Sequence, residues 1–399
     1  MIPFNRPYYD HLEILAALRP GLGRCDFESA LAARARAKYG LTFSYGRAGI
    51  IAAFKALGIA EAEVILPAYT CLVMAHAVMA SGNRPIFADI DLADYNVTIK
   101  NLKQALTPQT RAVVATHMYG YPTDVDAIRA AIGDDPIIII EDCALAPQVL
   151  SSAGNGLRGD LGLFSFGAGK PLSAYGGGAL VTHSAEIYEK IKAYRDQKMR
   201  RTSCQSKAKQ WKKLLTSYVL ASKRIYATVY RPKTQAEVNR KFKLPADYMP
   251  SDIAMTFPHF QARVGLVQLQ KVDHIIAQRR ALARLYNREL QDCPGLYPAP
   301  IQADATYAYY TIRVPRRDAV DFEGRMIRRG VAVDRSYHYA LPYLQAYQPF
   351  ARGEFPHAAQ AAREVINLPC YPHLRDADAR YIAESVRDAM HVIRSSGLV

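Results

Sequence analysis

Paired cysteines of the kind that form disulfide frameworks or zinc sites are absent from this sequence. No C-x-x-C pair occurs, and the six cysteines are scattered over the chain: Cys25, Cys71, Cys143, Cys204, Cys293 and Cys370. This pattern argues against a small disulfide-stapled fold and against a cysteine zinc site, so we expect no metal. Reduced cysteines are typical of the cytoplasm, which is the compartment that we expect.

Long apolar runs are also absent. The first fifteen residues, MIPFNRPYYDHLEIL, contain no continuous apolar core of signal-peptide type, and no run elsewhere is long enough to span a bilayer. We therefore expect a protein that is soluble or peripheral at the inner membrane surface. The 399 residues, 50% of them hydrophobic, suffice to bury a substantial core and to form a large domain and a smaller one.

Acidic residues are nearly missing from one segment. Between positions 198 and 243 there are fourteen lysines or arginines and a single acid, Glu237, so this segment carries nearly the whole net charge of +15. Because the excess is local, the high pI is a weak argument for nucleic-acid binding. We interpret residues 199–250 as an insertion with an amphipathic helix in KKLLTSYVLASKRIYATVY (212–230). Three roles stay open for it: a solvated surface helix, a peripheral contact with anionic lipid, or attraction of an acidic substrate or nucleic acid.

The region from about Thr42 to Ser184 alternates short apolar runs with helix-like stretches, which predicts an α/β domain with a mostly parallel sheet. Strands are predicted at 63–68, 84–91, 111–120, 136–142 and 178–184. Helices are predicted at 49–58, 70–82 and 124–133, and Gly82 and Gly133 close two of them.

The later sequence predicts a smaller α+β domain. Residues 261–290 have the period of a long connecting helix that leads out of the large domain, and TYAYYTIRV (306–314) is predicted as a strand. The resulting division has five parts: an N-terminal arm with helices (1–40), a large domain (41–198), the basic insertion (199–250), the completion of the large domain with the connecting helix (251–290) and a small C-terminal domain (291–399).

An acid pair ends the most apolar predicted strand. In PIIIIED (136–142), four isoleucines predict a strand covered on both faces, and its acids fall at the C-terminal end, where open α/β sheets bind ligands. A carboxylate buried there needs a cation or a hydrogen-bond donor, because unpaired burial is costly. Asp142 could hold a protonated pyridine nitrogen, or it could only cap the following helix.

One lysine lies in an apolar, glycine-rich setting. Lys170 has no charged neighbour within FSFGAGKPLSAYGGGALVT (164–182), although a lone lysine is ordinarily a solvated surface group. Loss of solvation would make its neutral amine more accessible, so Lys170 could attack an aldehyde and form a Schiff base. Ser165 could place a hydroxyl on a phosphate, and the glycines at 176–178 let backbone approach a ligand closely.

A glycine-containing turn, SYGRAG (44–49), opens the helix predicted at 49–58. Free N–H groups at the positive end of a helix dipole form an anion site, so Gly46, Arg47 and Ala48 would cradle a phosphate. Many helices begin in this way, so the turn alone is a weak signal.

A second glycine motif points elsewhere and is rejected. Gly154, Gly156 and Gly159 spell the dinucleotide fingerprint G-x-G-x-x-G. They do not lie tightly between a predicted strand and a predicted helix, and the acid expected downstream is missing, so a Rossmann interpretation fails.

In their order along the chain, these motifs resemble the DegT/StrS-type sugar aminotransferases. The resemblance rests on SYGRAGI, VILPAYTCLVMAHAV, PIFADIDLADYNV, VATHMYGYPTDVDAI, IIIIEDCALA, FSFGAGKPL with GGGALVT, and QARVGLVQL with QRRALARLYNREL. It runs from IPFNRP near the start to INLPCYP near the end, and so covers nearly the whole chain outside the basic insertion.

The resemblance implies a type I aminotransferase fold and a homodimer with active sites at the subunit interface. It also implies pyridoxal 5'-phosphate as cofactor and transfer of an amino group from glutamate or glutamine to a keto sugar nucleotide, as in polysaccharide biosynthesis. Lys170 matches the imine-forming lysine and Asp142 the partner of the pyridine nitrogen. The phosphate ligands would be Ser165, Gly46, Arg47 and Ala48.

Several positions depart from the family's pattern. Cys71, in PAYTC, stands where an aromatic ring commonly stacks on the cofactor, so stacking would fall to Tyr69. Leu145 replaces a Gln or His that bonds the ring hydroxyl, and Arg47 replaces the usual threonine. The Asn and Arg usually found before the QA helix are absent, since 255–258 read MTFP.

His338, in DRSYHYALP, matches the region that lines the family's substrate pocket, although a histidine in a tyrosine-rich turn can be purely structural. Retention of Lys170, where dehydratase relatives carry histidine, favours transamination. Two alternatives stay open: a dehydration or a transamination of a non-sugar ketone by the same imine, and a cofactor-binding regulator without catalysis.

Overall fold

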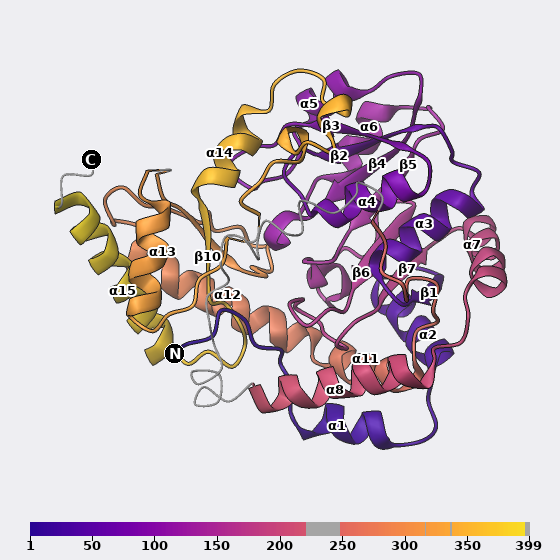
Figure 1. Cartoon of the computed structure of the whole chain (residues 1–399), viewed down its shortest axis with the longest axis horizontal. Coiled ribbons are helices and arrows are strands. Elements are labelled where there is room, and N and C mark those ends of the chain that lie inside the picture. The colour runs from indigo at the N-terminus through magenta and orange to yellow at the C-terminus, as the bar shows by residue number, and fades with distance from the viewer. Residues whose placement is uncertain (221–247, 316, 336, 396–399) are drawn as a thin grey trace.

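The computed structural model describes residues 1–220, 248–315, 317–335 and 337–395. Its centre is a seven-stranded sheet in the order β1-β7-β6-β5-β4-β2-β3 (Figure 1). The neighbours from β3 to β6 pair in parallel, whereas β7 is antiparallel to both β6 and β1. The strands are β1 (Tyr39–Phe43), β2 (Glu63–Pro67), β3 (Arg84–Ala88), β4 (Thr110–Thr116), β5 (Ile138–Asp142), β6 (Leu161–Ser165) and β7 (Gly178–Thr182).

Helices cover both faces of this sheet, as the apolar strands require. Alternate residues of one strand face opposite layers: Ile140 packs with the layer of α3 and α4, and Ile139 with that of α5 and α6. The helices of this part are α1 (His11–Leu18), α2 (Arg24–Arg34), α3 (Gly46–Ala56), α4 (Leu72–Ala80), α5 (Ile99–Ala105), α6 (Val125–Ile132) and α7 (Ala185–Lys198).

All five predicted strands and all three predicted helices of this region are confirmed, and the sheet is mixed and mostly parallel as expected. Gly133 is the C-cap of α6 and Gly82 follows the C-cap of α4, both with positive φ. Strands β1 and β6 and helices α5 and α7 were not predicted. Glycine interrupts both strands, at Gly40 and Gly162, and weakens their β-strand signal.

The connecting helix is divided into α11 (His259–Gln270) and α12 (Val272–Leu290) at Lys271, so the prediction of one long helix is wrong. Lys271 has φ −94° and ψ −2°, and its ammonium binds Asp10 at 2.9 Å and Glu13 at 2.6 Å. The N-terminal arm therefore holds the junction, and α11 packs against α1 and α2 while α12 packs against α15 (Asp376–Ser395).

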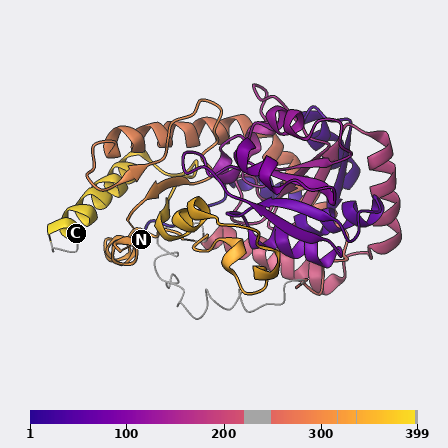
Figure 2. The ribbon, with the colours of Figure 1, turned by 90° about the horizontal axis from the view of Figure 1, so that it is seen from above.

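The C-terminal residues gather at one end of the molecule, where Figure 2 shows them in orange and yellow. They form a three-stranded antiparallel sheet in the order β10-β9-β8, as the predicted α+β unit requires, and the strand predicted at 306–314 is shorter. The elements are β8 (Tyr297–Pro298), β9 (Tyr310–Arg313), α13 (Ala319–Arg328), α14 (Pro356–Glu364) and β10 (Val365–Leu368). Short 3₁₀ turns lie at Met118–Gly120, Pro147–Leu150, Leu341–Tyr343 and Gln348–Phe350. The five-part division itself stays a prediction.

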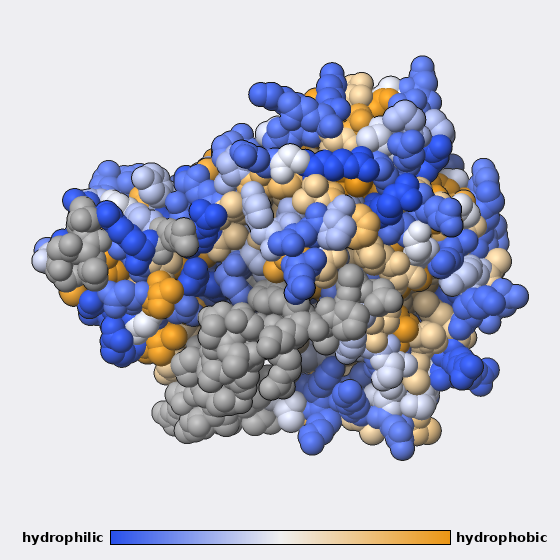
Figure 3. All heavy atoms as spheres, turned by 45° about the horizontal axis from the view of Figure 1, so that its top comes forward, coloured by the Kyte–Doolittle hydropathy of each residue, from blue (hydrophilic) through white to orange (hydrophobic). Residues whose placement is uncertain are grey.

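The basic insertion contains α8 (Cys204–Leu220), which begins earlier than the helix predicted at 212–230. That prediction is confirmed up to residue 220, and the rest of it lies outside the described residues. None of the described helices combines the length and apolar character that crossing a membrane demands. On the face in Figure 3, hydrophilic side chains project around the outline, and apolar ones lie between them toward the middle.

Candidate active site

Asp142 lies at the carboxyl end of β5, between Thr116 of β4 and Leu163 of β6. Its side chain is buried, and one carboxylate oxygen accepts a hydrogen bond from the Ala144 N–H at 3.0 Å. Burial raises the pKa of Asp142, and the charge of Lys170 opposes that rise. The two residues that the sequence singles out are therefore close enough for their charges to interact. The local bond to Ala144 belongs to a turn, because no helix begins at this position.

Lys170 belongs to the loop that leaves β6, and it is half-buried. Its backbone N–H donates to Gly167 at 2.9 Å, and the Tyr309 hydroxyl donates to the carbonyl of Gly169 at 3.0 Å. The loop returns to β7 through Gly176 and Gly177, whose φ values are +141° and +86°. A turn inside the loop and a tyrosine from the C-terminal part thus hold the lysine backbone at the end of the strand next to Asp142.

The predicted phosphate turn meets the same loop. Helix α3 begins at Gly46, and a Cβ added there would lie 3.9 Å from the Ser165 Cβ. A Cβ added to Gly178 would lie 2.5 Å from the Gly46 backbone, so only glycine allows β7 to come this close to the start of the helix. The structure therefore brings Ser165 beside the amino end of α3, where the first N–H groups lack intrahelical partners.

Arg47, in the first turn of α3, is half-buried. Its guanidinium lies 5.9 Å from the centre of the Tyr45 ring and donates to the Tyr248 carbonyl at 3.5 Å. Burial lowers the pKa of Arg47, and the neighbouring Cys71 opposes this shift. Arg47 and Cys71 are thus near one another, and Ala48 is buried at the next position of the helix.

Buried tyrosines surround the other side of this site. Tyr69, which follows β2, is almost fully buried, and its hydroxyl bonds to that of Tyr119 at 2.7 Å. The ring of Tyr337 lies 6.1 Å from Tyr69 and 5.7 Å from Tyr119. Burial raises the pKa of Tyr337, and Cys71 and Asp142 add to the rise. Tyr69 is therefore fixed within a tyrosine cluster, while Cys71 is partly exposed at the start of α4.

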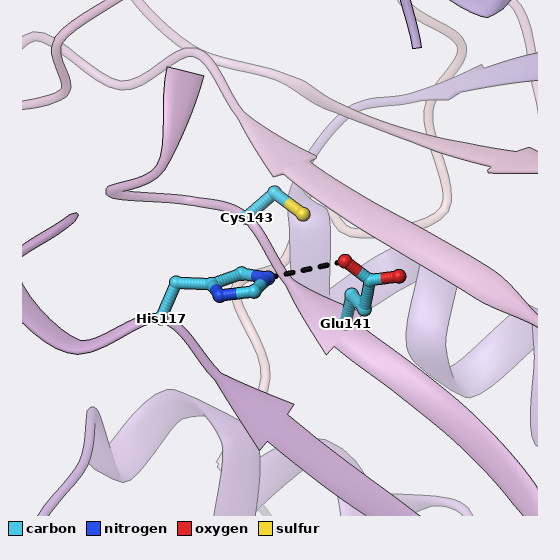
Figure 4. Close-up of side chains that lie close together, drawn as sticks. All are labelled: His117, Glu141 and Cys143. Atoms are coloured by element: carbon cyan, nitrogen blue, oxygen red, sulfur yellow. Dashed lines mark hydrogen bonds and ion pairs between the residues drawn. The ribbon is translucent and has the colours of Figure 1, made fainter. Parts of the chain in front are cut away.

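A buried His–Glu pair includes the residue that precedes Asp142, and Figure 4 shows this pair with Cys143 beside it. His117 follows β4 and bonds Glu141 of β5 through Nε2 at 3.1 Å, while its Nδ1 accepts from the Thr123 N–H at 2.9 Å. This arrangement assigns the ring proton to Nε2. Although burial opposes its charge, hydrogen bonds from His117 and from the N–H groups of Gly159 and Arg158 keep the pKa of Glu141 below its usual range.

The His–Glu pair lies within 4.8 Å of the Cys143 sulfur, so these three residues resemble a metal-binding group. However, both ring nitrogens of His117 and both oxygens of Glu141 are already engaged in hydrogen bonds. Burial also raises the pKa of Cys143 well above its usual value, which favours the neutral thiol. The His117–Glu141 pair therefore acts as a hydrogen-bonded support for Asp142, the residue that follows Glu141.

His117, Tyr119, Tyr309 and Tyr337 were missed in the sequence. For the first two a signal existed, because HMYG follows β4 and the carboxyl ends of parallel strands meet at one edge. Tyr119 has a positive φ of 55°, which is uncommon for a residue with a side chain. Tyr309 and Tyr337 approach from the C-terminal part through tertiary packing, which no local pattern reveals.

The remaining predicted positions have clear local settings. His338 bonds the Arg335 carbonyl through Nδ1 at 2.8 Å, and its ring meets Tyr339 edge-on at 6.1 Å. Leu145 is buried. The rejected glycine motif precedes strand β6, not a helix, which agrees with the rejection. Phe257 of the MTFP segment packs against Gly177, where a Cβ would collide with its ring.

Comparison with known proteins gives a consistent family. The sequence profile of the DegT/DnrJ/EryC1/StrS aminotransferase family matches residues 17–387. The pleiotropic regulatory protein of Geobacillus stearothermophilus is 29% identical, with 90% of this chain and 87% of the relative covered. The UDP-N-acetyl-3-dehydro-alpha-D-glucosamine 3-aminotransferase of Acidithiobacillus ferrooxidans is 28% identical, with coverage of 91% and 88%.

The fold is shared as well. A solved aminotransferase from Streptoalloteichus hindustanus superposes with a TM-score of 0.78 at 25% identity, over 99% of this chain and all of that one. The type I aminotransferase fold expected from the sequence is thereby confirmed. The profile spans nearly the whole chain and the solved structure shares its architecture, so this chain belongs to the DegT/DnrJ/EryC1/StrS aminotransferase family.

Proposed function

We propose that this chain is a pyridoxal 5'-phosphate-dependent transaminase that converts a nucleotide-linked keto sugar into an amino sugar. The observation that carries the proposal is the buried carboxylate of Asp142 within electrostatic reach of Lys170, at the edge of the sheet where ligands bind. The relative from Acidithiobacillus ferrooxidans acts, by its name, on a UDP-linked dehydro sugar. That name supports a sugar nucleotide as the substrate class.

The residues present fit this cofactor. Burial raises the pKa of Asp142, and a protonated ring nitrogen near the carboxylate would add to the effect of Lys170 and favour the charged form. The amino end of α3 together with Ser165 suits a phosphate group. When bound, the cofactor supplies a reactive aldehyde and an electron sink.

The chain's own groups then have separate tasks. The amine of Lys170 anchors the cofactor, and in its free form Nζ takes and returns a proton at the substrate carbon. Asp142 would keep the ring nitrogen of the cofactor protonated. His117 and Glu141 keep the end of β5 in register, and the tyrosine cluster of Tyr69, Tyr119 and Tyr337 excludes water.

A single substitution tests the assignment. Lys170→Ala should abolish turnover and the visible absorption band of the holoenzyme, because no amine remains to bond the cofactor. Lys55→Ala is a matched control, since Lys55 is an exposed lysine on α3. Persistence of both turnover and band in the Lys170→Ala variant would contradict the proposal.

Two other functions make different predictions. A dehydratase, or an enzyme for a non-sugar ketone, would not couple an amino donor to a keto sugar nucleotide. We propose glutamate or glutamine as the donor, and bleaching of the visible band by one of them supports transamination. A cofactor-binding regulator is favoured by the name of the Geobacillus stearothermophilus relative, and it would keep cofactor binding while every keto-sugar nucleotide fails as substrate.

We further propose a homodimer with active sites at the subunit interface, on the basis of the family resemblance. Light scattering coupled to gel filtration should give twice the mass of the chain. The monomer mass at all concentrations would contradict this assembly.

For the basic insertion, we propose a peripheral contact with anionic lipid at the cytoplasmic side of the membrane. The exposed face of α8 combines Lys212 and Lys213 with Leu215, 50% exposed, and Tyr218, 44% exposed. Flotation with anionic liposomes, with and without residues 199–248, tests it. Binding that does not depend on anionic lipid would contradict this membrane contact.

A further inference from the structure

A cavity of about 550 Å³ lies between α1, α2, α8 and α11, and Lys170 is not among the residues that line it. Figure 1 shows α1, α8 and α11 together along one side of the molecule. Residues from the first turns of three helices line it: Arg24 of α2, Lys207 of α8 and His259 of α11. The positive ends of three helix dipoles therefore converge on one space.

Cationic side chains line this cavity without acidic ones. Arg24, Arg201 and Lys207 contribute to its wall, and within the part of the chain that the structure describes no acid does so. Across those same residues, no ion pair engages any of the three. Arg263 also lies in the wall, but its guanidinium is occupied by the carbonyls of Ala16, Ala17 and Leu22.

The positive charges of this cavity act on His259. Its pKa is lowered first by burial and then by Arg24, Arg263 and Lys207. The ring lies against Gly23, the residue before α2, where an added Cβ would collide with it. Positive charges from α2, α8 and α11 therefore act on the same imidazole ring, and a bound anion would oppose their lowering of its pKa.

Aromatic side chains also line the cavity. Trp211 of α8 stacks on Phe260 of α11 with ring centroids 4.8 Å apart and an interplanar angle of 19°. The space is much larger than one phosphate ion, so a phosphate with an attached organic group fits.

We propose that this cavity binds a phosphate-bearing anion through Arg24, Arg201 and Lys207, with the organic part of the ligand against Trp211. The chemistry is shared by a soluble phosphate compound and by a phospholipid headgroup. In either case the site is independent of amino transfer at Lys170.

The sequence offers a direct probe, because Trp211 is its single tryptophan. Inorganic pyrophosphate, titrated into the holoenzyme at constant ionic strength, should give a saturable change in tryptophan fluorescence. Vesicles of phosphatidylglycerol, compared with vesicles of phosphatidylcholine, test the headgroup source with the same signal. A response to pyrophosphate identifies a soluble source, and a response to phosphatidylglycerol alone identifies the lipid source.

A double variant tests the residues. Arg24→Gln with Lys207→Gln should weaken binding by about tenfold or more, since two charge-assisted contacts are lost. Lys100→Gln with Lys103→Gln removes the same charge from exposed positions of α5 outside the cavity, and it should bind like the parent chain. Binding should also tighten as the pH falls, because an anion favours protonated His259.

Two results would overturn the proposal. One is the absence of any saturable response to both pyrophosphate and phosphatidylglycerol vesicles. The other is equal weakening in the cavity variant and in the Lys100/Lys103 control, which would show that only diffuse surface charge is involved.

Discussion

The close contact between β7 and the start of α3 allows a sharp prediction. A Cβ at position 178 would lie 2.5 Å from both the N and the Cα of Gly46, and 2.8 Å from the Phe164 carbonyl oxygen. All three atoms are backbone, so no flexible side chain can move aside. Atoms at van der Waals contact are about 3.5 Å apart, so Gly178→Ala must separate β7 and α3 by about 1 Å.

The cost follows from this displacement. Over-packing a well-packed core typically costs about 1–3 kcal/mol, which urea unfolding of the Gly178→Ala variant should measure. The shift also moves the Gly46 turn away from Ser165, so affinity for pyridoxal 5'-phosphate should fall by about tenfold or more. Absorbance titration of the apoenzyme measures that affinity.

A control separates this effect from glycine replacement in general. At Gly324 of α13 an added Cβ would meet only the Arg328 side chain at 3.5 Å, so Gly324→Ala should bind the cofactor normally and unfold no more easily. If Gly178→Ala matches the parent chain in both stability and cofactor affinity, the phosphate turn is not held by this contact and the reasoning is refuted.

Three further predictions concern neighbouring residues. Asp142→Asn should lower kcat at least about a hundredfold while the absorption band persists, and steady-state kinetics near the parent rate would contradict its role. Glu141→Gln should destabilise the fold by about 1–3 kcal/mol at pH 7. The pKa of Glu141 is lower in the fold than in the unfolded chain, so ionised Glu141 stabilises the fold above the unfolded pKa, and this stabilisation is lost in acid. The difference in unfolding free energy between the parent chain and Glu141→Gln should therefore disappear below about pH 4. His338→Gln should raise KM for the keto substrate with unchanged cofactor affinity, and an unchanged KM would make this histidine structural.

The strands of the central sheet could be predicted because their apolar runs are continuous. Isoleucines 137–140 need cover on both faces, and the structure supplies it from two helix layers. The position of the acid that ends this strand could also be predicted, because parallel strands place their carboxyl ends at one edge of the sheet, where ligands bind. Strand β1 and strand β6 escaped prediction because glycine shortens their apolar pattern.

The break between α11 and α12 could not be predicted from periodicity. The helical period continues through Lys271, and the carboxylates that bind its ammonium at the break, Asp10 and Glu13, are distant in the sequence. The His117–Glu141 pair has the same origin, because its partners lie on adjacent strands. The sequence could place both residues at one edge of the sheet, but not predict that their side chains would bond.

The sequence alone predicted the α/β class and the family resemblance, and it singled out Asp142 and Lys170 as the residues that we propose for the chemistry. These depend on local composition: an apolar strand that ends in an acid, and a lysine without charged neighbours among glycines. Only the tertiary structure decided the tyrosine cluster, the His117–Glu141 support and the cavity beside Trp211. Each of these joins residues from separate elements, and such contacts are set by packing geometry that no local pattern encodes.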